Sequence, residues 1–340
     1  MNFSKLKKVY IIAESGVNHN GSLRKAIEMV KLAKKAGADA IKFQSFSADN
    51  LALKVTPKTH YQSRNLNSKI SHYQMLKKLE LSNLETTHLM KICKKLSIDF
   101  ISTPYDVENA KFLLKNKVKV IKIASADIVD FFLHKYLRKK KCSIIISTGM
   151  TDIKEIKEAL RYYKNFDKKK ICLLHCVSNY PCSNDYLNMN CLMEIKKLGY
   201  QIGFSDHTDN DVASVLSIGM GCKVVEKHFT LNKNYVGPDH KASLNPDELK
   251  SFIKNIRIAE KSLGKFKKFC QNEELNMKKV SRKSLVSARS IKMGKKIKIH
   301  DIKLMRPGYG ISPFHIKKIL NKVTTKEIKK NTILNLNMFK

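Results

Sequence analysis

Eight short apolar runs, each followed by a polar cluster and then by a longer segment, organise the chain up to residue 263. The runs lie at 9–13, 38–43, 98–102, 119–123, 143–147, 171–175, 201–205 and 223–227. Apolar residues recur with helical spacing at 22–36, 84–96, 107–115, 152–163, 190–198 and 211–220. A last helix is expected at 246–263, with Asn245 as its cap and Pro246 at its first position. Eight such units are what a (β/α)8 barrel requires. An open doubly wound sheet is the alternative, but it would need fewer strands or a visible switch point.

The barrel interpretation places chemistry just past the carboxyl ends of the strands, where the strand-to-helix loops gather. Polar residues do follow the runs there: Glu14, Lys42, Gln44, Thr103, Lys122, Ser125, Asp127, Ser147 and Tyr180. Lys42 and Lys122 each interrupt an apolar strand, and a buried ammonium group without a partner is costly. Two such lysines on different strands indicate an anionic substrate. The alternative is that both side chains extend to solvent.

Two histidines follow consecutive strands near the end of the repeat. His207 and His228 should lie at the same end of neighbouring parallel strands, which are about 4.8 Å apart. Imidazole suits a divalent transition metal, and Asp206, Glu226 and Asp239 provide carboxylates nearby. The sequence therefore indicates a candidate metal site. The alternative is that each histidine only caps its own loop.

Two segments depart from the repeat. Residues 47–78 contain few apolar residues and leave the same face of the expected barrel, so we expect a functional loop or lid. After the barrel domain at 1–264, residues 265–280 are polar and suggest a linker, and 281–340 contain short strand-like runs typical of a small β-rich domain. Its sequence MRPGYG should form a tight turn that presents Arg306, a residue suited to carboxylate or phosphate. An ordinary surface arginine is the alternative.

The net charge of +37 raises the question of nucleic-acid binding. Only eight of the 66 basic residues are arginine, and the lysines are spread over every expected helix, so we expect a solvated lysine coat and no nucleic-acid partner. The eight cysteines form no C-x-x-C pair, which favours reduced thiols. The apolar run before Glu14 is too short for a signal peptide, and no run is long enough to span a membrane. These features predict a soluble, cytoplasmic protein.

Ten motifs together resemble the bacterial sialic acid synthase (N-acetylneuraminate synthase) family with its C-terminal antifreeze-like (SAF) domain. They are IIAESGVNHNGSL, AGADAIKFQ, FISTPYD, KIASAD, ISTGM, LHCVSNYP, GFSDHT, EKHFT, GPDHKAS and RPGYG. The resemblance covers nearly the whole chain. It implies a (β/α)8 barrel at 1–264, a linker at 265–280 and an antifreeze-like domain at 281–340.

The resemblance also implies roles for individual residues. His207 and His228 match ligands of a divalent ion, with manganese first and magnesium or cobalt as alternatives. Lys42 and Lys122 match lysines that bind phosphoenolpyruvate, with Thr103 and Ser125 assisting. The residues that match positions facing the amino-sugar are Gln44, Tyr180 and Asp239, and we place Asp127 and Ser147 in the same substrate-binding set. Glu14 matches the acid beside the reacting carbons, acting as a base or orienting water. Arg306 matches an arginine delivered into the partner subunit's site, which implies a domain-swapped homodimer.

The implied reaction condenses phosphoenolpyruvate with N-acetylmannosamine and water to give N-acetylneuraminate and phosphate. Legionaminate or pseudaminate synthesis from a diacetamido hexose is the alternative, and GPDHKAS is more similar to the neuraminate and legionaminate branches. The chain departs from the family at Ala126 and Asp127, where a Gly-Glu pair is common, and at Ser178, where some relatives have Asn. Two other classes remain open: an aldolase that uses a Schiff-base lysine, and a non-catalytic basic binding protein.

Overall fold

The computed structural model describes residues 1–340 except 60–61, 64 and 66–69. The chain divides into two compact units, Met1–Gly264 and Lys265–Lys340. Each unit has its own hydrophobic core.

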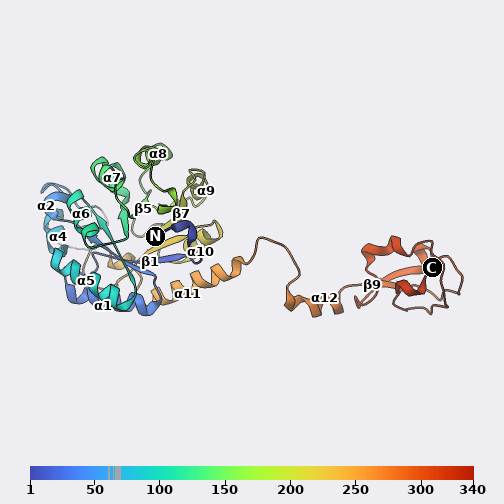
Figure 1. The fold of residues 1–340 in the computed structure, drawn as a ribbon. Coiled ribbons are helices and arrows are strands. Elements are labelled where there is room, and N and C mark those ends of the chain that lie inside the picture. Colours follow the sequence, from blue (N-terminus) through green and yellow to red (C-terminus); the bar gives the residue numbers. More distant parts are fainter. Residues whose placement is uncertain (60–61, 64, 66–69) are drawn as a thin grey trace. The chain divides into compact units, whose positions relative to one another are not determined.

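Eight parallel strands of the first unit close into a barrel in which the first strand pairs with the last (Figure 1). The strands are β1 (Tyr10–Gly16), β2 (Ala40–Ser45), β3 (Asp99–Pro104), β4 (Val120–Ile123), β5 (Ser143–Ser147), β6 (Ile171–His175), β7 (Gln201–Asp206) and β8 (Val224–His228). All eight runs expected from the sequence are strands, so the (β/α)8 prediction is confirmed. A doubly wound fold has an open sheet with a switch point, so the closed barrel rules out that alternative.

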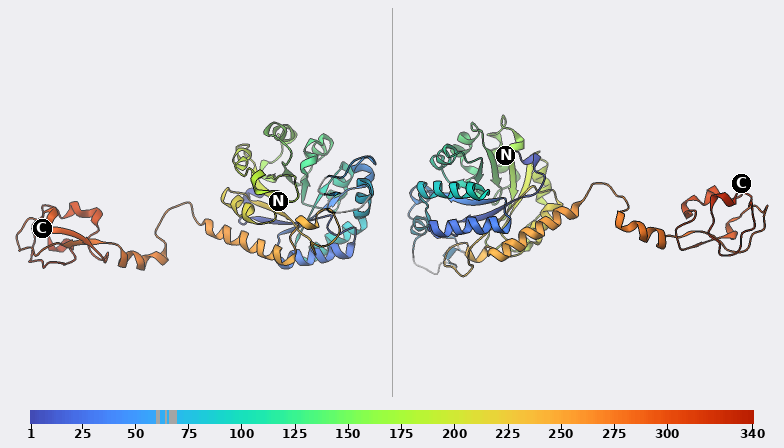
Figure 2. Two further views of the ribbon diagram at one scale, coloured as in Figure 1. Left: turned by 180° about the vertical axis from the view of Figure 1, so that it is seen from behind. Right: turned by 60° about the horizontal axis from the view of Figure 1, so that its bottom comes forward.

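A ring of helices surrounds the strands, as the two views of Figure 2 show. The main helices are α1 (Leu23–Ala36), α5 (Asn83–Leu96), α6 (Val107–Lys115), α7 (Phe131–Leu137), α8 (Ile153–Arg161), α9 (Cys191–Lys196), α10 (Val212–Gly219) and α11 (Pro246–Leu263). The sequence pattern missed α7, because its two turns are too short for helical periodicity to show. Asp130 defines its start by accepting a hydrogen bond from the Leu133 amide at 2.9 Å. Asn245 caps α11, as predicted, by accepting from the amides of Asp247 and Glu248.

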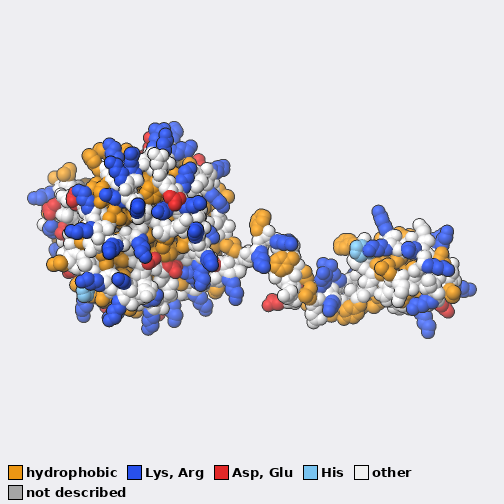
Figure 3. All heavy atoms as spheres, in the orientation of Figure 1, with side chains coloured by type: hydrophobic (Ala, Val, Ile, Leu, Met, Phe, Trp, Pro, Cys, Tyr) orange, Lys and Arg blue, Asp and Glu red, His pale blue; other side chains and the backbone are white. Residues whose placement is uncertain are grey.

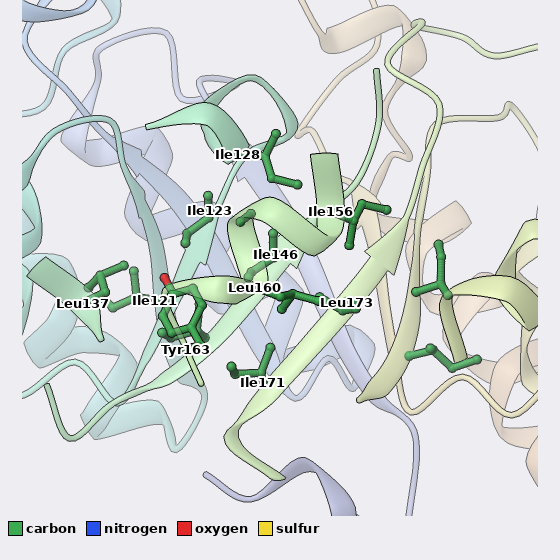
Figure 4. Packing of buried hydrophobic residues seen from close by; sticks show 14 of the residues in the cluster. Ile121, Ile123, Ile128, Leu137, Ile146, Ile156, Leu160, Tyr163, Ile171 and Leu173 are labelled. Atoms are coloured by element: carbon green, nitrogen blue, oxygen red, sulfur yellow. The ribbon is translucent and has the colours of Figure 1, made fainter. Parts of the chain in front are cut away.

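Side chains alternate between the inside and the outside of the barrel along each strand. Ile12, Ala40, Ile101, Val120 and Val224 pack together in a cluster inside the barrel. The alternate residues of each strand point outward and pack against the helices. Figure 4 shows this for Ile121, Ile146, Leu173 and their neighbours. One step beyond the inner apolar layer, the inward positions are polar. This alternation therefore decides which strand-end residues can face a common site.

The segment after β2 holds two helices in its described part, α2 (Ala48–Leu51) and α4 (His72–Leu79). Met75, Leu76 and Leu79 of α4 are buried in a small core with Val17 and Phe46. The expected functional loop therefore contains packed helical structure. The carboxyl end of α4 closely approaches the β1–α1 loop: a Cβ on Gly21, whose φ is +70°, would lie 2.2 Å from the carbonyl oxygen of Lys78.

The second unit contains α12 (Leu275–Ser281), β9 (Ser284–Ser287) and β10 (Ile302–Met305), with β9 and β10 antiparallel. Leu285, Ile291, Ile297 and Leu334 belong to its own small core. The segment 265–280, interpreted from sequence as a linker, contains most of α12. Figure 3 shows lysine and arginine side chains scattered over the visible surface of both units. Among the helices of the described residues, none is long and apolar enough to cross a membrane.

Candidate active site

A cavity of about 600 Å³ opens at the carboxyl ends of the barrel strands. Eleven of the thirteen predicted site residues line it: Glu14, Lys42, Gln44, Thr103, Lys122, Ser125, Ser147, Tyr180, His207, His228 and Asp239. They come from six of the eight strands or from the segments that follow strands, and they are spread over more than 220 positions of sequence. Barrel closure brings them together. The volume of this cavity is within the range of pockets that hold small organic ligands.

Two lysines and two carboxylates form the buried floor of this cavity. Lys42 Nζ lies 2.8 Å from Glu14 Oε1 and 3.7 Å from Glu226 Oε2. Lys122 Nζ lies 3.4 Å from Glu226 Oε1, which also accepts a hydrogen bond from Ser205 Oγ at 2.9 Å. All four charged side chains are at most 4% exposed. Within the described part of the chain Lys122 has one long ion pair, so its ammonium group retains capacity to bind an anionic ligand.

Glu226 is the part of this floor that sequence reasoning missed. The sequence indicates only a carboxylate near the candidate metal site, whereas the structure places Glu226 between the two lysines. The available signal was its position two residues before His228, which puts both side chains on the inward face of β8. The partner lysines come from β2 and β4, however, and only the closed barrel shows that one carboxylate reaches both.

Burial acts to raise the pKa of the Glu14 and Glu226 carboxyl groups, but the two lysines oppose this effect much more strongly at Glu226 than at Glu14. The pKa of Glu14 rises to about 7, because burial and the charge of Glu226 outweigh Lys42. Burial would also raise the pKa of Glu226, yet Lys122 and Lys42 together lower it to about 2. Burial lowers the pKa of Lys122, although Glu226 opposes this. Glu226 is therefore the permanent anion of the floor, and Glu14 is the carboxyl group suited to exchanging a proton near neutral pH.

His207 and His228 lie beside this floor with ring centroids 5.5 Å apart. His207 Nδ1 lies 2.6 Å from the backbone oxygen of Val177, and this contact orients the ring and leaves Nε2 directed toward Ser205 Oγ at 3.2 Å. His228 Nδ1 is buried and has no hydrogen-bond partner among the described residues. Tyr180 packs against both rings, at 4.2 Å and 5.3 Å between centroids.

The histidine pair has the properties of a partial metal site. Burial lowers the pKa of His207 to about 4 and that of His228 well below its ordinary value, so both rings are neutral, the form that binds metals. A ring nitrogen held by a backbone carbonyl and an unpartnered buried nitrogen also fit a ligand pair. Within the described residues, no three His, Cys, Asp or Glu side chains converge tightly enough to form a full ligand set. The residues thus fit an ion that takes its remaining ligands from substrate or water.

A second buried ion pair lies on the outer side of β7 and β8, next to the two histidines. Lys227 Nζ is 3.1 Å from Asp206 Oδ1, and both side chains are at most 1% exposed. Lys227 also donates to the backbone oxygens of Thr208 at 2.7 Å and Asn210 at 2.9 Å. The pair therefore ties the loop after His207 to the strand that carries His228.

Hydrogen bonds between two loops hold Asp239 at the cavity. Asn18 Nδ2 donates to Ser243 Oγ at 2.8 Å, and Ser243 Oγ in turn donates to the backbone oxygen of Asp239 at 2.6 Å. His240 connects Thr230 Oγ1 at 2.7 Å with Asn20 Oδ1 at 3.1 Å. The NHNG and GPDHKAS motifs thus form one network between the first and last strand-to-helix loops.

Two predicted site residues remain, Asp127 in the barrel unit and Arg306 in the second unit. Asp127 is half-buried in the turn after β4 and is absent from the described cavity lining. Its Oδ2 is buried without a hydrogen-bond partner among the described residues. Arg306 is exposed on the second unit. Its expected role in a partner subunit stays a prediction.

We expect the replacement Asp127→Asn to stabilise the protein at neutral pH by about 1–3 kcal/mol. Burial, with Asp130 nearby, raises the pKa of Asp127 from 3.8 to about 7. The folded state therefore retains a proton that the unfolded state has lost, and wild-type stability falls as pH rises from about 4 to about 7. Urea unfolding at pH 4 and pH 8 checks this. The variant should exceed wild type only at pH 8, and an equal gain at both values would contradict the assignment.

Comparison with known proteins agrees with the geometry. Residues 29–268 match the NeuB family and residues 282–340 match the SAF domain. N,N'-diacetyllegionaminic acid synthase of Legionella pneumophila is 39% identical over 96% of this chain and 93% of its own length. Pseudaminic acid synthase of Campylobacter jejuni is 32% identical over 96% of both chains. The crystal structure of a sialic acid synthetase from Leptospira borgpetersenii, in complex with citrate, has a TM-score of 0.69 at 31% identity and covers 80% of this chain and 90% of its own.

Proposed function

The chain belongs to the NeuB family, and from this premise we propose that it condenses phosphoenolpyruvate with an acetamido hexose to form a nonulosonic acid. The observation that supports this proposal most is the charged cavity floor. Lys42 and Lys122 are buried on neighbouring sides of Glu226, where an anion with a carboxylate and a phosphate finds two cations in a water-poor site. Thr103, Ser125 and Ser147 provide hydroxyl groups around them.

In the proposed reaction, the enol carbon of phosphoenolpyruvate forms a bond to the aldehyde carbon of the open-chain sugar. The aldehyde oxygen takes a proton and becomes a hydroxyl group. Water adds at the carbon that carries the phosphate, and loss of inorganic phosphate leaves the keto acid. Lys42 and Lys122 stabilise the charge on the phosphate and carboxylate as it shifts. Glu14, whose pKa is near 7, accepts or orients the proton of the attacking water.

We propose His207 and His228 as the protein ligands of a divalent ion, with manganese first and magnesium or cobalt as alternatives. When bound, such an ion polarises the aldehyde oxygen as a Lewis acid. Two neutral, buried imidazole groups support this assignment. Tyr180 packs against both rings, tilted to His207 and edge-on to His228.

Two sugars are candidates for the substrate that condenses with phosphoenolpyruvate. N-acetylmannosamine would give N-acetylneuraminate, and a diacetamido hexose would give a legionaminate-type product. The 39% identity to a protein named N,N'-diacetyllegionaminic acid synthase exceeds the 32% identity to the human N-acetylneuraminate-9-phosphate synthase and the 32% identity to a pseudaminic acid synthase, which favours the diacetamido hexose of the legionaminate branch. We place the reaction in the cytoplasm, where phosphoenolpyruvate is made.

We further propose a homodimer in which Arg306 of one subunit completes the site of the other. An exposed arginine on the small unit is available for this role. Arg306→Ala should lower turnover, and mixing it with an inactive barrel variant, His207→Ala, should restore part of the activity through hybrid dimers. Full activity of Arg306→Ala alone would contradict the role.

The test of the proposed reaction is phosphate release from phosphoenolpyruvate and Mn²⁺ with a panel of acetamido sugars, followed by the mass of the product. We expect release to depend on a sugar, to stop with EDTA and to return with added Mn²⁺. Trapping by borohydride in the presence of pyruvate, insensitive to EDTA, would instead indicate a Schiff-base aldolase. Salt-sensitive binding to polyanions that survives Lys122→Ala, without phosphate release, would indicate a basic binding protein.

A further inference from the structure

One face of α4 borders the cavity with an unusual combination of side chains. His72, Met75, Leu76 and Leu79 have the spacing i, i+3, i+4 and i+7, so they share one side of the helix, and all four line the cavity. Met75, Leu76 and Leu79 are buried apolar residues. The face therefore presents a polar ring at one end and an apolar surface along the rest.

His72 carries a hydrogen-bonding atom that no described residue satisfies. Its Nδ1 is buried and has no hydrogen-bond partner within the described part of the chain. Burial, with Lys58 nearby, lowers the pKa of the ring, so the imidazole is neutral at physiological pH. A buried polar atom without a partner costs free energy unless a ligand pairs with it.

The protein holds α4 in a fixed position. Ser71 and Gln74 form a capping box at its start. Asp49 of α2 accepts hydrogen bonds from Tyr73 and from Lys77, the latter at 3.0 Å. Glu80, just past the helix, accepts from the Ala48 amide at 2.6 Å. Such a face is preorganised, so a ligand group that fits it loses little free energy to ordering the helix.

An acetamido group needs both features at once, because its amide forms hydrogen bonds and its methyl group prefers an apolar contact. The strand ends hold the reacting groups, and the sugar's aldehyde carbon must lie there. C2 is one bond from that carbon, so its substituent stays near the floor. C4 is three bonds from it, so its substituent can reach the part of the cavity lining that α4 provides.

We propose that this face of α4 is a specificity subsite that binds a C4 acetamido group of the sugar. The inference rests on the proposed condensation and narrows its substrate to a diacetamido hexose. Met75, Leu76 and Leu79 contact the acetyl methyl group, and His72 Nδ1 pairs with the amide. A C4 hydroxyl group, as in N-acetylmannosamine, leaves His72 unpaired and places a polar group against the apolar side chains.

The experiment compares two sugars that differ only at C4: N-acetylmannosamine and its 4-acetamido-4-deoxy analogue. Binding to the full-length protein is measured by calorimetry without phosphoenolpyruvate, and kcat/KM by phosphate release. Wild type should prefer the diacetamido sugar about tenfold or more in both measurements. His72→Leu should lose about tenfold for that sugar and change little for N-acetylmannosamine, while His72→Gln, which keeps a hydrogen-bonding group, should recover part of the loss.

The matched control is His88→Leu, which removes an exposed histidine of α5 and should change neither sugar. Equal binding of both sugars to wild type, or an equal loss for both in His72→Leu, would overturn the subsite. Selective binding without phosphate release from any sugar would support the subsite and refute the proposed condensation. Phosphate release that favours N-acetylmannosamine would support the proposed condensation and refute the subsite.

Discussion

Replacing Lys122 with methionine is expected to lower kcat/KM for phosphoenolpyruvate by about 10²–10³-fold. Lys122 is 3% exposed and lines the cavity, and its single ion pair with a described residue is with Glu226 at 3.4 Å. Methionine keeps most of the length of the side chain and removes the charge that would face the anionic substrate. Steady-state phosphate release at varied phosphoenolpyruvate concentration measures the effect.

Two controls separate this effect from damage to the fold. Lys119→Met removes an exposed lysine just before the same strand and should leave kcat/KM unchanged. The double variant Lys122→Met, Glu226→Gln neutralises both members of the pair, so it should regain stability lost in the single variant without regaining activity. Near wild-type kcat/KM in folded Lys122→Met would exclude this lysine from the anion site.

Replacing Lys227 with methionine is expected to destabilise the barrel by about 3–5 kcal/mol. Lys227 and Asp206 lie 3.1 Å apart and are almost fully buried. Without the lysine, the buried Asp206 carboxylate keeps its hydrogen bonds from Thr208 and Ser214 but has no counter-charge, and the backbone oxygens of Thr208 and Asn210 lose their donor. Calorimetric unfolding should show a large drop in the Tm of the barrel.

Lys223→Met is the matched control, because this lysine directly precedes the same strand but is only half-buried. Its cost should stay within about 0.5 kcal/mol. Adding Asp206→Asn to Lys227→Met should recover part of the stability, since no unpaired charge then remains. A loss below about 1 kcal/mol in Lys227→Met would mean that the ion pair contributes little beyond what packing supplies.

The site was predictable to the extent that it depends on strand ends. Each polar residue directly after a run, from Glu14 to His228, could be assigned to one face of the barrel without knowing its neighbours. Asp127 shows where that reasoning fails. It lies five residues beyond Lys122, inside a turn, and the turn directs it away from the cavity lining. Distance in sequence from a strand end does not report the direction of a side chain in a loop.

The α4 face is the other part of the site that could not be predicted from the sequence. Residues 47–78 contain too few apolar residues to show a helical pattern over their length, and His72 had no motif to mark it. Its relevance depends on the packing of α4 against Val17 and Phe46 and on its close approach to Gly21.

The sequence by itself determined the barrel, the small second domain and the family, because periodic apolar runs and local motifs are properties of short segments. Only the tertiary structure decided that Glu226 joins Lys42 to Lys122 inside the barrel while Lys227, the next residue, pairs with Asp206 outside it. The physical reason is that a charged residue on a strand needs a partner at its own depth and on its own face. That partner comes from another strand, so it is known only once the barrel has closed.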